Sequence, residues 1–155
     1  MDCGGGGIKA SVLDASGTMR VQPTRIPTPY PLPPKKFVAT LTTLAAQFPP
    51  VQRVSVGLPG MIRHGVVIST PHYVTTRGPR SRVDPKLQQQ WHGFDARTAL
   101  AEAFQVPTLV VNDAELHAAG VVAGQGLELV LTLGTGLGCA LFDGGNPAIT
   151  KPPSL

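Results

Sequence analysis

The chain begins with a carboxylate and a run of four glycines that together could bind a phosphate. Asp2 is followed by Cys3 and then by Gly4-Gly5-Gly6-Gly7, and Lys9 comes two residues later. Consecutive glycines let successive backbone N–H groups turn toward one anion without interference from Cβ atoms. A carboxylate at a strand end can hold a Mg²⁺ ion or its waters. Taken alone, the pattern fits a plain tight hairpin turn equally well.

A second glycine turn lies near the other end of the chain. The segment Gly134-Thr135-Gly136-Leu137-Gly138 follows an apolar run, and Thr135 adds a hydroxyl donor to the glycines. One such turn is weak evidence for function. Two of them, each flanked by segments typical of strands, indicate a cleft with phosphate-binding turns on both sides.

A candidate general base lies between the two turns. Asp113 directly follows the apolar segment 108–111 and begins a segment typical of a helix. A carboxylate there can take the proton from a substrate hydroxyl as it attacks phosphate, while the amide of Asn112 offers both donor and acceptor to sugar hydroxyls. The commoner role of such an aspartate is a helix N-cap. The order of glycine turn, Asn-Asp and glycine turn favours the catalytic interpretation.

The elements that must position these residues follow from periodicity and from turn residues. Strands alternate with helices, and an early hairpin makes the sheet mixed, so we predict an α/β fold. Segment 75–90 is polar and is predicted to be a loop or an insertion. The predicted strands cover residues 8–14, 18–22, 53–57, 66–69, 108–111, 127–133 and 139–142, and the proline-rich segment 23–34 is predicted to be an extended strand that leads into a surface connection. The predicted helices cover about 35–47, a segment capped by Asp95, and 114–123.

Composition excludes several classes of protein. With 155 residues, 42% hydrophobic and 14% charged, the sequence is typical of one globular domain. The net charge of +4 permits an anionic ligand, but no aromatic-plus-basic motif favours nucleic acid. We expect a cytoplasmic protein, because neither a signal peptide nor a membrane-spanning apolar run is present. Two cysteines, Cys3 and Cys139, are too few for a zinc cluster.

The order of the motifs resembles the ROK family of sugar kinases and repressors, and within it the polyphosphate glucokinase-like members. Their first phosphate motif is matched by Asp2, Gly4, Gly5 and Lys9, with Gly6 in place of the usual hydroxyl residue. Leu58-Pro59-Gly60 resembles the family's turn at the sugar site, and Asn112-Asp113 matches its sugar-binding Asn and catalytic Asp. The second phosphate motif is matched by Leu133-Gly134-Thr135-Gly136-Leu137-Gly138. Two further segments, Arg63-His64-Gly65-Val66-Val67 and Pro27-Thr28-Pro29, are similar to the polyphosphate branch.

The resemblance implies an actin-like ATPase (ribonuclease H-like) domain and a phosphoryl transfer. The donor would be ATP or polyphosphate with Mg²⁺, and the acceptor a hexose, through the 6-hydroxyl of glucose. Asp113 would be the general base and Asp2 the partner of Mg²⁺. The sugar would contact Gly60, His72, Asn112 and Asp113, and the phosphates would contact Gly4, Gly5, Gly6, Lys9, Gly134, Thr135, Gly136 and Gly138.

The sequence also departs from the family pattern. His72 stands where the family usually has asparagine, and the basic stretch from Arg77 to Lys86 lies in the predicted insertion at about 75–90. That stretch would grip a polyanionic donor, or it is a solvated loop. We expect residues 1–145 to form the N-terminal lobe and 146–155 a tail, with the second lobe absent. The alternative to a kinase is then a truncated, non-catalytic remnant that binds sugar or phosphate, or an interaction module, and an exposed sheet edge would favour a homodimer.

Overall fold

The computed structural model describes residues 1–133 and 137–148. The chain forms two compact units, Met1–Asp113 and Ala114–Leu155, so the division lies inside the range 1–145 that the sequence suggests as one lobe. Each unit is described by itself below. None of the described helices is long and apolar enough to cross a bilayer.

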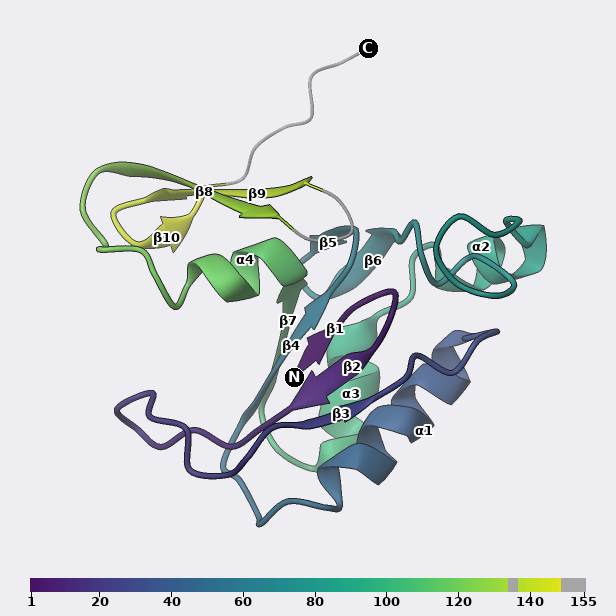
Figure 1. Cartoon of the computed structure of the whole chain (residues 1–155), viewed down its shortest axis with the longest axis horizontal. Coiled ribbons are helices and arrows are strands. Elements are labelled where there is room, and N and C mark those ends of the chain that lie inside the picture. Colours follow the sequence, from purple (N-terminus) through teal and green to yellow (C-terminus); the bar gives the residue numbers. More distant parts are fainter. Residues whose placement is uncertain (134–136, 149–155) are drawn as a thin grey trace. The chain divides into compact units, whose positions relative to one another are not determined.

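The first unit is built on a mixed five-stranded sheet, which confirms the predicted α/β fold (Figure 1). Its order is β3-β2-β1-β4-β7, with β1 antiparallel to β2, β2 antiparallel to β3, and β1, β4 and β7 parallel. The strands are β1 (Asp2–Cys3), β2 (Ile8–Ala10), β3 (Thr24–Ile26), β4 (Val54–Leu58) and β7 (Thr108–Asn112). The three parallel strands therefore end at one edge of the sheet.

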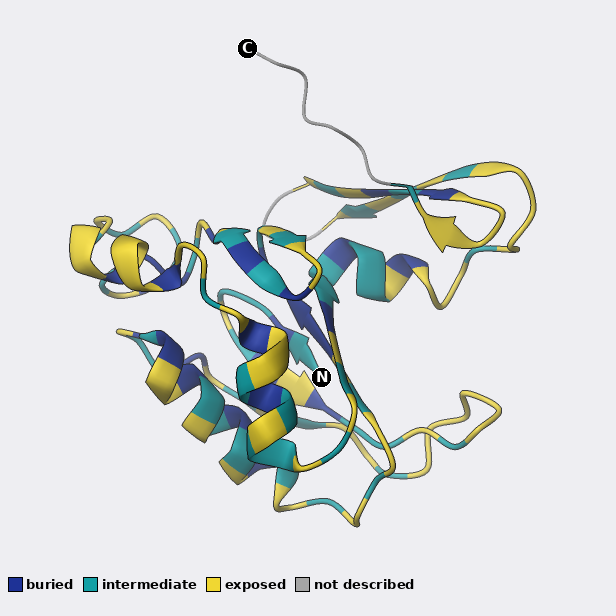
Figure 2. Cartoon of the chain, turned by 180° about the vertical axis from the view of Figure 1, so that it is seen from behind, coloured by how far each residue is buried: buried dark blue, intermediate teal, exposed yellow. Residues whose placement is uncertain are grey.

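Two helices, α1 (Pro34–Ala45) and α3 (Ala96–Phe104), cover one face of this sheet (Figures 1 and 2). Phe37, Leu41 and Leu44 recur at helical spacing along α1 and are buried against the sheet. The opposite face of the sheet carries exposed side chains, because neighbouring residues of a strand point to opposite sides.

Segment 75–90 is not a loop throughout, so the loop alternative is wrong for residues 85–90, while an insertion at 75–90 stays a prediction. Helix α2 (Pro85–Trp91) begins after Asp84, whose carboxylate accepts a hydrogen bond from the Lys86 N–H at 2.8 Å. An aspartate N-cap followed by proline is a strong helix start. Leu87 and Trp91 are buried one helical turn apart, and the Trp91 indole donates to the Leu32 carbonyl at 2.8 Å.

Other boundaries also differ from those predicted. The predicted hairpin is confirmed only around its turn, where Leu13 forms an antiparallel bridge with Met19 and Asp14 Oδ1 accepts hydrogen bonds from the N–H groups of Ser16 and Thr18. Within the sheet the partner of β2 is β3 and not residues 18–22. The hairpin of β5 (Met61–Arg63) and β6 (Val66–Ser69) contains one strand that the sequence analysis missed. Helix α4 (Asp113–Ala118) ends earlier than residue 123, just before Gly120.

The second unit contains β8 (Leu127–Leu133), β9 (Leu137–Asp143) and β10 (Asn146–Pro147) in an antiparallel sheet of order β10-β9-β8. Its small core is formed by Ala114 and Ala118 of α4 with Ala140 and Phe142 of β9. The other face of the hairpin is apolar and exposed, with side chains 57–88% accessible at Leu127, Leu129, Leu131, Leu133 and Leu137. Residues 134–136, where the second glycine turn is predicted, lie outside the described residues.

Candidate active site

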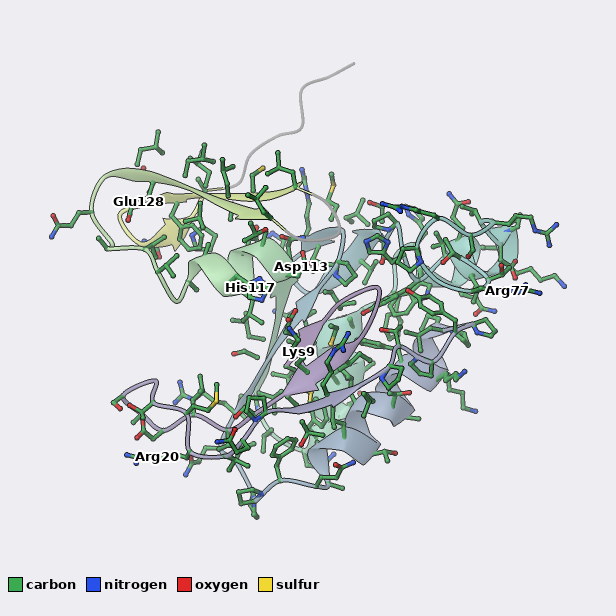
Figure 3. All side chains as sticks on the ribbon, viewed as in Figure 1. Lys9, Arg20, Arg77, Asp113, His117 and Glu128 are labelled. Atoms are coloured by element: carbon green, nitrogen blue, oxygen red, sulfur yellow. The ribbon has the colours of Figure 1, made fainter. Side chains whose placement is uncertain are left out.

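The candidate site lies where the three parallel strands of the first unit end. Asp2 pairs with Gly57 of β4, and Leu58 of β4 pairs with Asn112 of β7. The first glycine turn, the Pro59-Gly60 turn and Asp113 each follow one of these strands. Ligands of open α/β sheets bind at the carboxyl ends of the strands. The sequence motifs from the first unit therefore meet at one edge (Asp113 and Lys9 are labelled in Figure 3).

Three carbonyls of the first glycine turn accept hydrogen bonds. The Gly4 N–H donates to the Gly7 carbonyl at 2.9 Å, which closes a tight hairpin turn. The Thr28 hydroxyl donates to the Gly4 carbonyl at 2.8 Å, and the Tyr30 hydroxyl donates to the Gly5 carbonyl at 2.9 Å. The amides of residues 5–7 donate to no backbone oxygen of the described residues. A turn that presents N–H groups in this way suits an anion.

Two positions of this turn have close neighbours, which are ring atoms at Gly5 and chiefly the movable end of the Arg25 side chain at Gly7. A Cβ at Gly5 would lie 2.8 Å from Pro79 Cγ and 2.9 Å from His72 Cγ, and a Cβ at Gly7 would lie 2.9 Å from Arg25 Nε. The turn is thus packed between β3 and the loop that follows β6. His72, predicted from the sequence at the sugar site, lies half-buried beside the first glycine turn.

The predicted sugar-site residues Asn112 and Gly60 are in direct contact. The Asn112 amide donates to the Gly60 carbonyl at 2.7 Å. Gly60 adopts φ +119, and a Cβ there would collide with the Ser69 carbonyl, so only glycine fits at this crossing. This contact fixes the end of β7, and therefore the position of Asp113, beside the Pro59-Gly60 turn.

Both carboxylates of the site act on the same buried groups. Burial chiefly raises the pKa of the Cys3 thiol to about 12, and the negative charges of Asp2 and Asp113 raise it further. Burial likewise raises the pKa of the Tyr73 phenol. The neighbouring charges raise this pKa further, in the decreasing order Cys3, Tyr30, Asp113 and Asp2. Asp2 and Asp113 therefore lie within electrostatic reach of one buried cluster. Thiol and phenol remain protonated at neutral pH.

The residues at this edge fit Mg²⁺ better than a metal held by protein alone. Mg²⁺ is usually bound through one or two carboxylates, with substrate phosphates and waters as the remaining ligands. Asp2 is half-buried at the start of β1, directly before the glycine turn that would hold those phosphates. Among residues 1–133 and 137–148, no three His, Cys, Asp or Glu side chains gather as a metal-binding group.

The second glycine turn adds less to the site. Gly134, Thr135 and Gly136 lie outside the described residues. Gly138 lies in β9, where a Cβ would collide with Thr132 Oγ1 and come within 3.1 Å of Ala114 Cβ. This packing by itself explains why glycine is present at 138. A phosphate contact by Gly138 stays a prediction.

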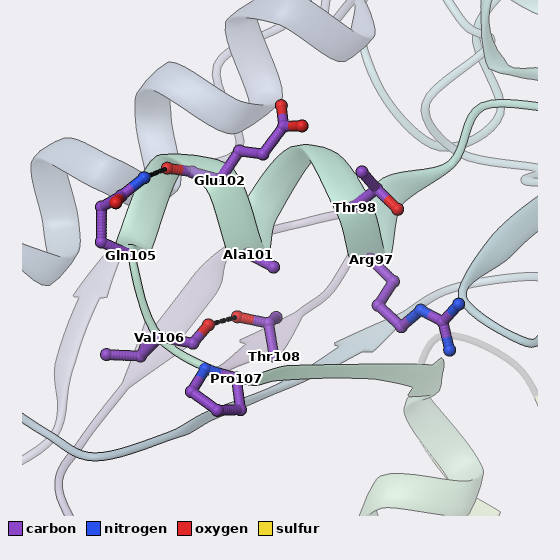
Figure 4. Close-up of a pocket in the computed structure, with 8 residues that line it drawn as sticks. All are labelled: Arg97, Thr98, Ala101, Glu102, Gln105, Val106, Pro107 and Thr108. Atoms are coloured by element: carbon purple, nitrogen blue, oxygen red, sulfur yellow. Dashed lines mark hydrogen bonds between the residues drawn. The ribbon is translucent and has the colours of Figure 1, made fainter.

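A separate surface depression lies at the opposite end of β7 (Figure 4). It is lined by α3 and the segment leading into β7, including Arg97, Glu102 and Thr108. Its polar groups bond internally: the Gln105 amide donates to the Glu102 carbonyl at 2.6 Å. The depression contains none of the predicted site residues.

Comparison with known proteins agrees with the motifs. The model of the ROK family matches residues 1–150. The chain belongs to the ROK family. It is 30% identical over 155 residues to a polyphosphate glucokinase of Mycobacterium tuberculosis and 28% identical to one of Mycobacterium leprae. In each case 94% of this chain is matched, against 52% and 43% of the relative, so the chain spans about half the length of the curated relatives.

Solved structures of the family share the fold. An inorganic polyphosphate/ATP-glucomannokinase from Arthrobacter matches with a TM-score of 0.73 and 31% identity, over 97% of this chain and 59% of that one. A ROK glucokinase from Streptomyces griseus, in complex with glucose and AMPPNP, matches with a TM-score of 0.72 and 25% identity, over 97% and 45%. These likenesses confirm the actin-like ATPase fold.

Sequence reasoning missed the residues that support the first glycine turn. Thr28 and Tyr30 hold its carbonyls, and Arg25 lies against Gly7. The Pro27-Thr28-Pro29 stretch marked the family branch but gave no indication of a hydrogen bond to a turn 24 residues earlier. Their roles depend on the packing of β3 beside β2.

Proposed function

We propose that this chain carries the sugar- and phosphate-binding part of a ROK hexose kinase, which transfers a terminal phosphoryl group from ATP or polyphosphate to the 6-hydroxyl of glucose. The observation that supports this most is the shared strand-end edge, where Asp113, Asn112 and the first glycine turn come together. Membership of the family supports a sugar-kinase reaction, and the roles of the individual residues are our inference.

In the proposed reaction Asp113 accepts the proton of the sugar hydroxyl. The hydroxyl oxygen forms a bond to the terminal phosphorus, while the bond from that phosphorus to the bridging oxygen breaks. The electron pair leaves with ADP or with the shortened polyphosphate. Phosphoryl transfer depends mainly on positioning and charge neutralisation. Asn112 would orient the sugar, and the amides of the glycine turn and Lys9 would hold the donor. Mg²⁺ held by Asp2, when bound, would neutralise phosphate charge.

The test is glucose phosphorylation, coupled to a dehydrogenase, with ATP or polyphosphate as donor. Asp113→Asn keeps the size of the side chain and removes the base, so kcat should fall by about 10²–10⁴-fold. Asp143→Asn, which removes an exposed carboxylate from β9, is the matched control. Equal turnover by wild type and Asp113→Asn would reject the proposed base.

A second candidate is a non-catalytic protein that binds sugar or phosphate without transferring a phosphoryl group. Calorimetric binding of glucose without turnover by the wild type would support this second candidate. Turnover abolished by Asp113→Asn would support the kinase.

The choice of phosphoryl donor can be tested through the basic loop, which is the stretch from Arg77 to Lys86. This loop lies against the phosphate turn, since Pro79 packs on Gly5, and a Cβ at Gly78 would lie 3.0 Å from the ring of Tyr30 (Arg77 of this loop is labelled in Figure 3). We expect simultaneous neutralisation of Arg77, Arg80 and Arg82 to weaken the use of polyphosphate more than the use of ATP. Equal effects on both donors would contradict a role in gripping a polyanion.

A further inference from the structure

Two cations face each other beside the phosphate turn. Lys9 of β2 and Arg25 of β3 are direct cross-strand partners. Direct partners place their Cβ atoms on the same face, about 5 Å apart. The flanking pair Ile8 and Ile26 points into the core, so Lys9 and Arg25 lie on the opposite, exposed face.

Like charges placed directly opposite each other destabilise a sheet unless something neutralises them. Neither Lys9 nor Arg25 forms an ion pair with any residue that the structure describes. Lys9 has Asp2 as its partner on the other side, in β1, while Arg25 stands on the edge strand β3. An anion lying over β2 and β3 would relieve this repulsion.

Arg25 is also held against the turn. The place that a Cβ of Gly7 would occupy lies 2.9 Å from its Nε and 3.0 Å from its Nη2. The guanidinium therefore lies next to the turn, although Arg25 as a whole is exposed. Its planar group of N–H donors matches phosphate oxygens well.

We propose that Lys9 and Arg25 form a cationic track for a linear oligophosphate chain. The chain would start at the amides of the glycine turn and run over the exposed face of β2 to the edge strand β3. Lys9 and Arg25 stand on adjacent strands, one spacing of about 5 Å apart, so together with the amides of the turn they offer contacts to more than one phosphate group. This inference rests on the proposed function, because it extends the donor site of the same turn.

The test is calorimetric binding of orthophosphate, tripolyphosphate and ATP to the whole chain. Arg25→Gln should weaken tripolyphosphate binding roughly tenfold, as expected for a lost charged hydrogen bond, and orthophosphate binding by less. Arg53→Gln is the matched control: Arg53 is exposed and precedes β4 at the opposite end of the sheet, so its loss of charge should change binding less than twofold. Arg25→Lys, which keeps the charge, should recover most of the affinity.

Equal binding of tripolyphosphate by Arg25→Gln and Arg53→Gln would overturn the track. An equal loss for orthophosphate and tripolyphosphate would also overturn it, because the site would then hold one phosphate. A loss for ATP as large as for tripolyphosphate would extend the track to nucleoside triphosphates, while a loss confined to tripolyphosphate would assign it to inorganic chains. Circular dichroism and the urea midpoint verify that the variants fold. These binding measurements need no turnover. A chain that does not phosphorylate glucose can therefore still show the track, and a missing track appears as a loss of binding contrast and not as a loss of turnover.

Discussion

The glycines of the first turn are predicted to differ sharply in their tolerance of a side chain, and Gly5 and Gly6 make the best comparison. A Cβ at Gly5 would lie 2.8 Å from Pro79 Cγ and 2.9 Å from His72 Cγ, closer than carbon atoms approach without movement. Nothing lies within 4 Å of a Cβ at Gly6, and Gly6 is not among the residues with positive φ. Gly5→Ala must displace the loop that carries His72, and Gly6→Ala must displace nothing.

The expected magnitudes have opposite signs. Overpacking a well-packed place costs about 1–3 kcal/mol, so Gly5→Ala should lower the free energy of unfolding by that amount. Replacing glycine where the backbone already suits alanine reduces the entropy of the unfolded chain and gains about 0.4–1 kcal/mol, so Gly6→Ala should raise it. The two variants should therefore differ by roughly 1.4–4 kcal/mol.

The assay is urea denaturation followed by tryptophan fluorescence. Trp91 is the single tryptophan of the chain and is 1% exposed in the core of the first unit, so its emission reports the unfolding of that unit. Equal midpoints for Gly5→Ala and Gly6→Ala would refute the reasoning, since the packing of Pro79 and His72 on the turn would then contribute nothing.

Three further predictions follow from contacts of single residues. Tyr30→Phe removes the hydroxyl that donates to the Gly5 carbonyl and should lower the free energy of unfolding by about 1 kcal/mol in the same urea assay; an unchanged midpoint would contradict a supporting role for that bond. The pKa of the Cys3 thiol rises from 9.0 to about 12 on folding, so the folded chain retains its proton after the unfolded chain has lost it, and stability should decline as pH rises from about 9 to about 12. The stability of Cys3→Ala should decline less steeply over this pH range. The same pH profile of stability in Cys3→Ala and wild type would contradict a contribution from the thiol. Leu131→Lys on the exposed face of β8 should change stability by less than about 0.5 kcal/mol while raising the concentration at which the protein aggregates, measured by light scattering; a clear loss of stability would show that this leucine is packed.

Local signals were enough to predict most of the elements. The bounds of β6 and β8 agree with the prediction, because each is a short run with clear turn residues around it. Asp95 is confirmed as an N-cap, with its carboxylate accepting from the Thr98 N–H at 2.9 Å. Helix α2 was not predicted, because its polar residues are typical of a loop and outweighed the start signal of Asp84 followed by proline.

The supports of the site could not be predicted, because they are tertiary contacts. Nothing local to Tyr30 indicates that its hydroxyl reaches the carbonyl of Gly5, and nothing near Arg25 indicates that it pairs with Lys9. That pairing depends on the register of β2 with β3, and the two strands are separated by a long connection whose own turn is organised around Asp14. The sequence predicts an extended segment over 23–34, which contains β3, but gives no register for it against β2.

The departure of Gly6 from the family pattern changes how the first turn must recognise an anion. Open space around Gly6 shows that packing does not forbid a side chain there, so the usual hydroxyl is absent without a steric reason. In the proposed donor site, recognition at this turn would use the backbone amides of residues 5–7 and the neighbouring cations Lys9 and Arg25. Thr28 and Tyr30, which follow β3, donate hydrogen bonds to the carbonyls of Gly4 and Gly5. These two bonds would then position the turn for the donor in the absence of the family's hydroxyl.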